Sequence, residues 1–327
     1  MGILTRALLL LLLAVPSLAE DDTRGPEPQS LSAHFEARPA LTLGHGVGAE
    51  FRAPEAIGID PFGAVYVADT ENHRVLRFSA RGEFEFEYGG YGWDEGRLSQ
   101  PTGVSAQEGF RLFVVDAGND RIQSFSIQDS SDEGGVFAFR PGSGFKDEQL
   151  ARPYRLDLDA EGRIYVSDEL CHCVWIFTPT GELVAKLGGY GAEDARFDRP
   201  SGVAVSAKGE KVFVADAGNQ RVQVFDSVGN WIATWAGPAE SPLVEPIGVD
   251  VGADGRVYVA DAGTASVRVF NGEGVPLFTF GGPGDGPGRF RALRDVAVGP
   301  DGRVWTVDAE REVAEAYVIE RVSTPEQ

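Results

Sequence analysis

The sequence predicts an all-β protein made of repeated four-stranded units. An aspartate at the end of a β-branched or aromatic run recurs six times, at intervals of 45 to 52 residues. The runs are short, are bounded by turn residues and show no helical period. A repeat of this length is typical of stacked or radially arranged units. The six residues are Asp69, Asp116, Asp168, Asp216, Asp261 and Asp308. We therefore predict a six-bladed β-propeller of four-stranded antiparallel blades.

The four strands of each unit follow a constant phase. An apolar residue stands 18 or 19 residues before each aspartate, and in five of the six units a proline follows it after three residues. The expected strands are illustrated by Gly202–Val205, Val257–Asp261, Arg74–Phe78 and Phe84–Tyr88, in the order first to fourth. Each pair is separated by a glycine-containing or polar turn.

The two ends of the repeat array predict ring closure. The sixth unit has its third strand near Ala314–Ile319 and no fourth strand after it. Upstream of the first unit, Arg38–Leu43 has the pattern of a fourth strand. We expect this N-terminal strand to complete the last blade, because closure hides two strand edges. The propeller is expected to span residues 34–321, with a C-terminal tail at 322–327.

Residues 1–19 have the features of a secretory signal peptide. Arg6 supplies the positive charge, Ala7–Val15 the apolar segment, and a small-x-small cleavage pattern ends at Ala19. The apolar segment is too short to span a bilayer, so we expect no membrane anchor after cleavage. Residues 20–33 are polar and contain prolines, which indicates a flexible leader. The expected location is therefore exported, either periplasmic or extracellular.

The charge of the chain excludes one class of partner. The sequence has 29 basic and 50 acidic residues, a formal net charge of −21. Such a surface repels phosphate backbones, so we expect no nucleic-acid partner.

A polar motif, Asp-x-x-Asn-x-Arg, follows the second strand. The complete copies are Asp69/Asn72/Arg74, Asp116/Asn119/Arg121 and Asp216/Asn219/Arg221, and the other three units carry degraded copies. A buried carboxylate at a strand end accepts backbone N–H bonds and pairs with arginine. Since the six aspartates occur once per blade, we interpret them and Arg74, Arg121 and Arg221 as structural.

This pattern resembles the NHL repeat, a repeat of six-bladed propellers, over about residues 35–320. The resemblance implies an interaction module. Family members that bind RNA use a basic face, which this acidic chain lacks. The resemblance also implies an alternative, since NHL-type propellers include the lyase that cleaves peptidyl-α-hydroxyglycine, and other six-bladed propellers are lactonases. Both kinds of enzyme use a metal at the ring axis.

Two residues after the proline, most units have a small residue, because the inner strands crowd together at the axis. The third unit has Arg155 there and the sixth, opposite it in the ring, has Asp295. Two positions further along the first strand lie Asp157 in the third unit and Asp250 in the fifth. One interpretation is ion pairing between blades. The other is a polar pocket at the axis, in which Asp157, Asp250 and Asp295 would be the ligands of a calcium ion.

The third unit departs from the motif at Cys171-His172-Cys173. In an extended strand the two cysteine Cα atoms would lie about 6.6 Å apart, near the upper limit for a disulfide. A disulfide formed across a bend and a pair of free thiols both remain open. A zinc site is not expected, because His45 and His73 belong near the first blade and His172 near the third.

Exposed aromatic residues complete the candidate site. Tyr91 and Trp93 lie in one glycine-rich loop and Tyr190 in a matching loop, where they would anchor a peptide or glycan or cover a neighbouring blade. The candidate ligand-binding residues are Tyr154, Arg155, His172, Asp295, Tyr91, Trp93 and Tyr190.

We favour an exported recognition scaffold that binds a protein, peptide or glycan on one face of the ring. No catalytic residue and no required cofactor is predicted. The alternative is a metal-dependent lyase or hydrolase with its site at the ring axis.

Overall fold

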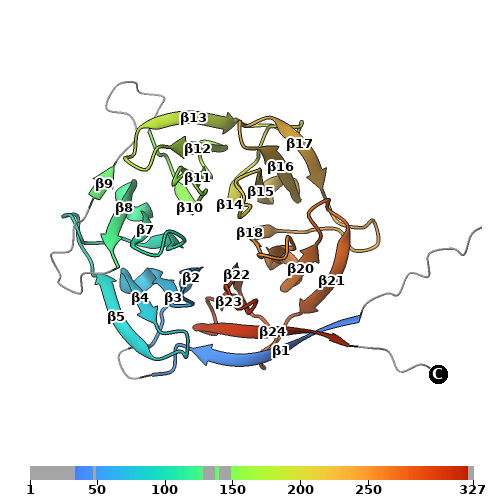
Figure 1. Cartoon of the computed structure of the whole chain (residues 1–327), viewed down its shortest axis with the longest axis horizontal. Coiled ribbons are helices and arrows are strands. Elements are labelled where there is room, and N and C mark those ends of the chain that lie inside the picture. Colours follow the sequence, from blue (N-terminus) through green and yellow to red (C-terminus); the bar gives the residue numbers. More distant parts are fainter. Residues whose placement is uncertain (1–33, 47–48, 128–136, 140–148, 323–327) are drawn as a thin grey trace, which may run out of the picture. The chain divides into compact units, whose positions relative to one another are not determined.

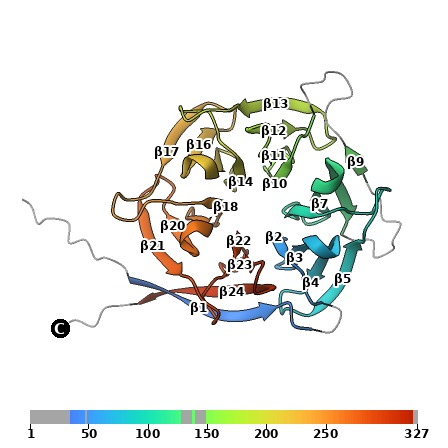
Figure 2. The same cartoon turned by 180° about the vertical axis from the view of Figure 1, so that it is seen from behind.

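The chain forms six four-stranded antiparallel sheets arranged around a central axis (Figure 1, Figure 2). The computed structural model describes residues 34–46, 49–127, 137–139 and 149–322. The predicted fold, an all-β six-bladed propeller, is confirmed. The expected signal peptide and leader at residues 1–33 lie outside the described residues, as do residues 323–327. None of the helices within the described ranges has the length and apolar character that a membrane crossing requires.

The blades follow one another along the chain. Blade 1 contains β2 (Pro54–Ile59), β3 (Val65–Asp69), β4 (Arg74–Phe78) and β5 (Phe84–Gly89). Blade 2 contains β6 (Pro101–Ser105), β7 (Arg111–Asp116), β8 (Arg121–Ser126) and β9 (Phe137–Phe139). Blade 3 contains β10 (Pro153–Leu158), β11 (Ile164–Asp168), β12 (Cys173–Phe177) and β13 (Leu183–Gly188). Blade 4 contains β14 (Pro200–Val205), β15 (Lys211–Asp216), β16 (Arg221–Asp226) and β17 (Trp231–Trp235).

Blade 5 contains β18 (Pro246–Val251), β19 (Val257–Asp261), β20 (Ser266–Phe270) and β21 (Pro276–Gly281). Blade 6 contains β22 (Leu293–Val298), β23 (Val304–Asp308), β24 (Val313–Val322) and β1 (His34–Leu43). In four blades a single 3-10 turn follows the second strand. These turns are η1 (Thr70–Asn72), η2 (Ala117–Asn119), η3 (Ala217–Asn219) and η4 (Ala262–Thr264).

The N-terminal strand closes the ring, as predicted. β1 pairs antiparallel with β24, from Leu43 opposite Ala314 to His34 opposite Val322. β24 ends at Val322, one residue beyond the expected boundary of the propeller. Blade 6 therefore combines three strands from the C-terminal side of the chain with one from the N-terminal side, and β1 covers the outer edge of β24.

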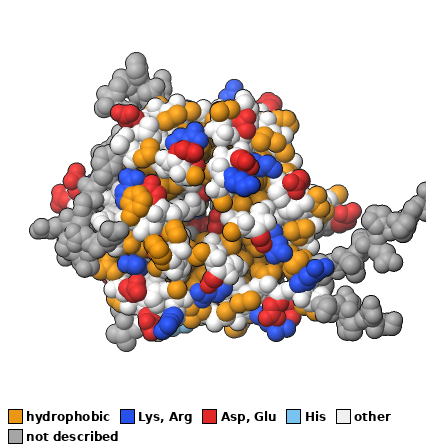
Figure 3. Space-filling model, viewed as in Figure 1, with side chains coloured by type: hydrophobic (Ala, Val, Ile, Leu, Met, Phe, Trp, Pro, Cys, Tyr) orange, Lys and Arg blue, Asp and Glu red, His pale blue; other side chains and the backbone are white. Residues whose placement is uncertain are grey.

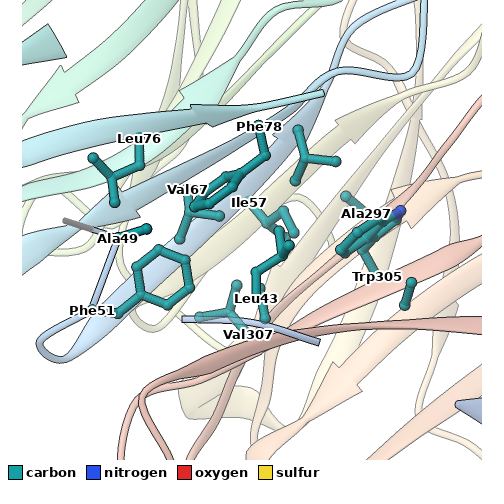
Figure 4. Packing of buried hydrophobic residues seen from close by; sticks show 13 residues of the cluster. Leu43, Ala49, Phe51, Ile57, Val67, Leu76, Phe78, Ala297, Trp305 and Val307 are labelled. Carbon is teal, nitrogen blue, oxygen red and sulfur yellow. The ribbon is translucent and has the colours of Figure 1, made fainter. Parts of the chain in front are cut away.

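The hydrophobic core lies between blades. Six clusters of buried side chains each draw on two neighbouring blades, so every interface between blades has its own core. Figure 4 shows the cluster that joins blades 6 and 1, which contains Leu43 and Phe51 together with Trp305 and Val307 of blade 6. The apolar residue that starts each repeat is buried in all six copies: Phe51, Leu98, Leu150, Phe197, Leu243 and Phe290.

Glycine near the start of the inner strands permits close approach at the axis. A Cβ atom added to Gly202 would lie 3.0 Å from the backbone of Ile247 and Val249 in the next blade. One added to Gly248 would lie 2.6 Å from a carboxylate oxygen of Asp295. The neighbouring inner strands therefore leave no room for a side chain at these positions.

Deletion of residues 34–43 is expected to destabilise the whole ring. The deletion exposes the edge of β24 and removes Leu43 from the cluster between blades 6 and 1, at a cost of several kcal/mol. Differential scanning calorimetry should show a melting temperature lowered by about 10 °C or more, or aggregation before unfolding. A chain that starts at residue 34 is the control. Equal melting temperatures of the two chains would contradict this role of β1.

Candidate functional site

The two faces of the ring differ in their loops. One face carries the inter-blade loops and the loops that follow the six repeat aspartates, and we name it the aspartate face. The opposite face carries the turns between the first and second strands, such as residues 60–64 and 206–210, and we name it the turn face.

The repeat aspartates organise the aspartate face. Each is buried and accepts a hydrogen bond from a backbone N–H in the loop that leads into its own blade. In blade 4, Asp216 also accepts bonds from Asn219 Nδ2 (2.9 Å) and Arg221 Nε (2.8 Å). Blades 1 and 2 have the same arrangement. These residues are distributed around the ring, one set per blade, and form a structural network.

A cavity of about 770 Å³ occupies the ring axis and opens on the turn face. Its rim includes exposed turn residues such as Ala160, Ala207 and Ala253. Its walls are the inner strands, with apolar side chains that include Ile59 and Val251. Figure 3 shows a hollow at the centre of the ring with acidic side chains inside it. The cavity thus combines apolar walls with a polar inner end.

Arg155 closes the inner end of this cavity. Its guanidinium donates hydrogen bonds to the backbone carbonyls of Glu55 (2.6 Å), Arg294 (3.0 Å) and Thr102. These acceptors belong to blades 1, 6 and 2, so one side chain from blade 3 joins four blades. Its Nε lies 3.4 Å from Asp295 Oδ2 on the opposite blade. Both side chains are buried, and the ion pair crosses the ring axis.

Three carboxylates on inner strands each form a hydrogen bond to the inner strand of the following blade. Asp157 accepts the N–H of Val205 (2.7 Å), and Asp250 accepts that of Val298 (2.6 Å). Asp295 accepts the N–H of Ile57 (3.1 Å). The inner strands have no neighbour on their axial side, so these carboxylates satisfy backbone donors that the ladder leaves unpaired.

Burial perturbs these carboxylates. It raises the pKa of Asp250 to about 7. Burial, together with the carboxylate of Asp250, raises the pKa of Asp157 well above its ordinary value. Burial also raises the pKa of Asp295, whereas the charge of Arg155 acts in the opposite direction. The inner end of the cavity is therefore a place where negative charge is costly unless a cation is close.

The described residues do not form the calcium site that the sequence left open. They contain no group of three or more His, Cys, Asp or Glu side chains arranged to hold a metal ion. Asp157, Asp250 and Asp295 instead direct oxygens to backbone N–H groups, and Arg155 neutralises the third. This donor set does not match the six to eight oxygen ligands that calcium takes.

The other candidate residues lie apart from the cavity. The guanidinium of Arg155 lies over the ring of Tyr154, and the Tyr154 hydroxyl donates to Glu55 Oε2 (2.9 Å). His172 lies in the loop after β11, where its Nδ1 accepts the N–H of Arg199 (3.0 Å) and its ring contacts Tyr190. Of the four residues predicted to bound a pocket, Arg155 and Asp295 line the axial cavity, whereas Tyr154 and His172 are not part of its lining.

The aromatic loops form two matching contacts between blades. His73 and Tyr91 join blades 1 and 2 in the way that His172 and Tyr190 join blades 3 and 4, with ring centroids 4.8 and 4.9 Å apart. The tyrosines remain 65% and 73% exposed, and Trp93 remains 66% exposed. These residues cover neighbouring blades and still present aromatic surface to solvent.

Cys171 and Cys173 form a disulfide, with Cα atoms 5.2 Å apart. His172 between them has a φ of 53°, which is the bend that brings the cysteines together. His73 has nearly the same φ, 57°, without any disulfide. The disulfide therefore occupies the place that the Asn and Arg of the polar motif hold in blade 1.

Sequence reasoning missed Ser105. This residue lines the cavity from β6, and its hydroxyl is buried with no hydrogen-bond partner among the described residues. The sequence could have identified Ser105 by its position in the repeat. Ser105 stands four residues after the proline that begins its first strand, as Asp157 and Asp250 do in their blades.

The comparison with protein families agrees with this architecture. The NHL repeat family matches residues 51–78, 197–225 and 243–270, which lie in blades 1, 4 and 5. The chain therefore contains NHL repeats and forms a six-bladed β-propeller. The matched segments contain the repeat aspartates Asp69, Asp216 and Asp261.

Several curated proteins resemble part of this NHL propeller. Protein brain tumor of Drosophila melanogaster is 31% identical over 150 residues, which is 45% of this chain and 13% of that protein. NHL repeat-containing protein 2 of Bos taurus is 27% identical over 174 residues, 46% of this chain and 24% of that protein. The similarity thus spans a quarter or less of these relatives.

Solved propellers share the fold at low sequence identity. A gluconolactonase from Xanthomonas campestris has a TM-score of 0.62 at 15% identity, covering 88% of this chain and 98% of the other. An inactive variant of virginiamycin B lyase from Staphylococcus aureus, solved with quinupristin, has a TM-score of 0.59 at 11% identity, covering 87% and 99%. At such identities the likeness concerns the fold alone.

The ion pair across the axis can be tested by a double-mutant cycle. Arg155→Met and Asp295→Asn are each expected to cost about 3 kcal/mol or more, because each leaves buried polar groups unpaired. The double variant should cost at least about 1 kcal/mol less than the sum of the two. Urea unfolding provides the free energies. The exposed pair Arg52 and Glu71, changed to Met and Gln, is the control and should show almost no coupling. Additive effects at Arg155 and Asp295 would contradict the pairing.

Reduction of the disulfide is expected to have a small effect. A cross-link that closes so short a loop contributes about 1–2 kcal/mol, and its loss should lower the melting temperature by about 2–8 °C. A Cys171→Ser/Cys173→Ser variant should melt at the lower temperature with or without reductant. A wild-type melting temperature that does not respond to reductant would show that the bond contributes nothing.

Proposed function

We propose that this NHL propeller is a non-catalytic recognition module that acts outside the cytoplasm and binds part of a protein, peptide or glycan in its axial cavity. The observation that carries the proposal is the cavity itself, about 770 Å³ in volume, open on the turn face and closed at its inner end by Arg155. Ligand pockets commonly have volumes of about 300–1,000 Å³ and mostly apolar walls with a few polar groups.

The polar groups of the cavity support binding over catalysis. The carboxylates of Asp157, Asp250 and Asp295 accept backbone N–H groups, and no nucleophile with an adjacent base accompanies them among the cavity-lining residues. The alternative is a metal-dependent lyase or hydrolase. This alternative is supported only by the fold that the chain shares with a lactonase and a lyase. At 11–15% sequence identity, a shared fold does not show a shared activity.

Two features support an exported protein. The Cys171–Cys173 disulfide is typical of an oxidising compartment. Residues 1–19 carry the pattern of a signal peptide. Ligands would then come from the periplasm or the extracellular medium.

A matched pair of tryptophan substitutions tests the location of the site. Ala207 is exposed on the rim of the cavity, and Ala192 is exposed on an inter-blade loop of the aspartate face. Ligand-observed NMR against a defined panel of tripeptides and disaccharides should detect binders of the wild-type protein. Ala207→Trp should abolish their signals, because the indole obstructs the mouth, and Ala192→Trp should preserve them.

Two results would contradict the proposal. The first is a panel that contains no binder, and the second is binding that survives Ala207→Trp but is lost in Ala192→Trp. The second result would move the site to the aromatic surface of Tyr91, Trp93 and Tyr190. Elemental analysis of the purified protein provides a separate check, since stoichiometric calcium or zinc would favour the enzyme alternative.

A further inference from the structure

We propose that the axial cavity recognises an aliphatic primary ammonium group, which enters from the turn face and is bound by Asp157, Asp250 and Ser105. This inference rests on the proposed function, because it names the chemical class of ligand for the same cavity. Two kinds of ligand carry such an ammonium group on an aliphatic chain: a free polyamine and the lysine side chain of a peptide.

The three residues occupy equivalent positions on different blades. In every blade, the residue at this position of the inner strand pairs with an aromatic residue three positions before the repeat aspartate. We name these six residues, all of which except Ala204 line the cavity, the axial layer: Gly58, Ser105, Asp157, Ala204, Asp250 and Ala297. Three members are polar, and the other three are glycine or alanine. The layer therefore combines hydrogen-bond acceptors with side chains small enough to leave space beside them.

The two carboxylates of the axial layer lack a cation. Among the described residues, Arg155 forms its ion pair with Asp295, and neither Asp157 nor Asp250 forms an ion pair with any basic side chain. Asp157 is buried and Asp250 is only partly exposed. Backbone N–H groups satisfy part of their hydrogen bonding, but a buried carboxylate charge with no cation beside it remains costly, and a cationic ligand would relieve that cost.

Ser105 is an independent indication of a ligand. Its side chain is more than nine-tenths buried and lines the same cavity, yet its hydroxyl has no hydrogen-bond partner in the described part of the chain. An unsatisfied buried hydroxyl destabilises a protein, so such groups are normally paired. An ammonium group has three N–H donors and no acceptor, which matches two carboxylates and one hydroxyl.

The walls of the cavity favour an aliphatic stem. Ile59, Val251 and Val298 are partly exposed and line the cavity between the axial layer and the rim. A chain of methylene groups would contact them while its ammonium group reaches the carboxylates, as lysine side chains do at apolar surfaces. A bare metal ion would leave these walls unused, and the described residues present no group of three metal-ligating side chains.

The affinity should depend on pH. Asp250 interacts electrostatically with the carboxylate of Asp157, with that of Asp295 on the neighbouring blade and with Tyr258 on β19, and Arg155 lies beside Asp295. Burial raises the pKa of Asp250 to about 7, so the carboxylate gains charge as the pH rises from 6 to 8. The ammonium group binds the ionised form. Its affinity should therefore increase about tenfold over this range, with release of a proton on binding below pH 7.

Isothermal titration with pentylamine tests the inference, and pentanol is the neutral probe of the same length. Pentylamine should bind to the wild-type protein at least about tenfold more tightly than pentanol. Asp157→Asn and Asp250→Asn should each weaken pentylamine at least about tenfold, and Ser105→Ala about threefold. Asp301→Asn is the control, because Asp301 lies in a turn of the same face outside the cavity lining, and it should change the affinity less than about twofold.

Two further probes distinguish the sources of the ammonium group. Tighter binding of spermidine than of the tripeptide Gly-Lys-Gly indicates a free polyamine, and the reverse order indicates a peptide side chain. Gly-norleucine-Gly is the control for the peptide, because it has the same charged termini and an aliphatic side chain without an ammonium group.

Three outcomes would overturn the inference: equal affinities for pentylamine and pentanol, affinities that do not change between pH 6 and 8, or folded Asp157→Asn and Asp250→Asn variants that bind pentylamine normally. The pH series uses the wild-type protein, so it remains decisive if the aspartate variants do not fold.

The failure of this inference can be distinguished from the failure of the proposed function. If neutral tripeptides or disaccharides bind, Ala207→Trp blocks that binding and pentylamine does not bind, the proposed function stands and only this inference is removed. Loss of both kinds of binding would remove both.

Discussion

The crowding of six inner strands around one axis is the constraint on which this structure depends. Strands that approach so closely accept only small side chains near their start, as the contacts around Gly202 and Gly248 show. The large apolar side chains are therefore placed between blades, where six clusters form. The buried repeat aspartates then fix each inter-blade loop to its own blade, and β1 closes the ring.

The axial cavity exists where this rule of small residues is broken. Arg155 fills the axis near the aspartate face, and its guanidinium joins carbonyls from three other blades. Beyond it, the axis remains open toward the turn face. Asp157, Asp250 and Asp295 connect neighbouring inner strands, yet within the described ranges only Asp295 has a cationic partner. The same carboxylates therefore stabilise the contacts between inner strands and place negative charge in the cavity that is costly without a nearby cation.

The sequence predicted the repeats, the four strands of each blade and the closing strand, because all of these follow from local periodicity and from a fixed spacing of turn residues. It also placed Arg155 and Asp295 on opposite blades, since blade number follows from counting repeats. It grouped His172 and Tyr154 with this pair, because all four belong to the same two blades. In the structure His172 lies in an outer loop against Tyr190, because distance from the axis depends on where along the blade a residue stands.

The sequence by itself determined the architecture, since a repeat of constant phase with alternating apolar residues has few other ways to bury its surface. Only the tertiary structure decided which face of the ring is open. That choice depends on the direction of one long side chain, Arg155, and on which carbonyls accept its hydrogen bonds. The tertiary structure also identified Ser105 as a buried hydroxyl with no hydrogen-bond partner in the described part of the chain. Whether a buried hydroxyl is paired depends on neighbours that are distant in the sequence.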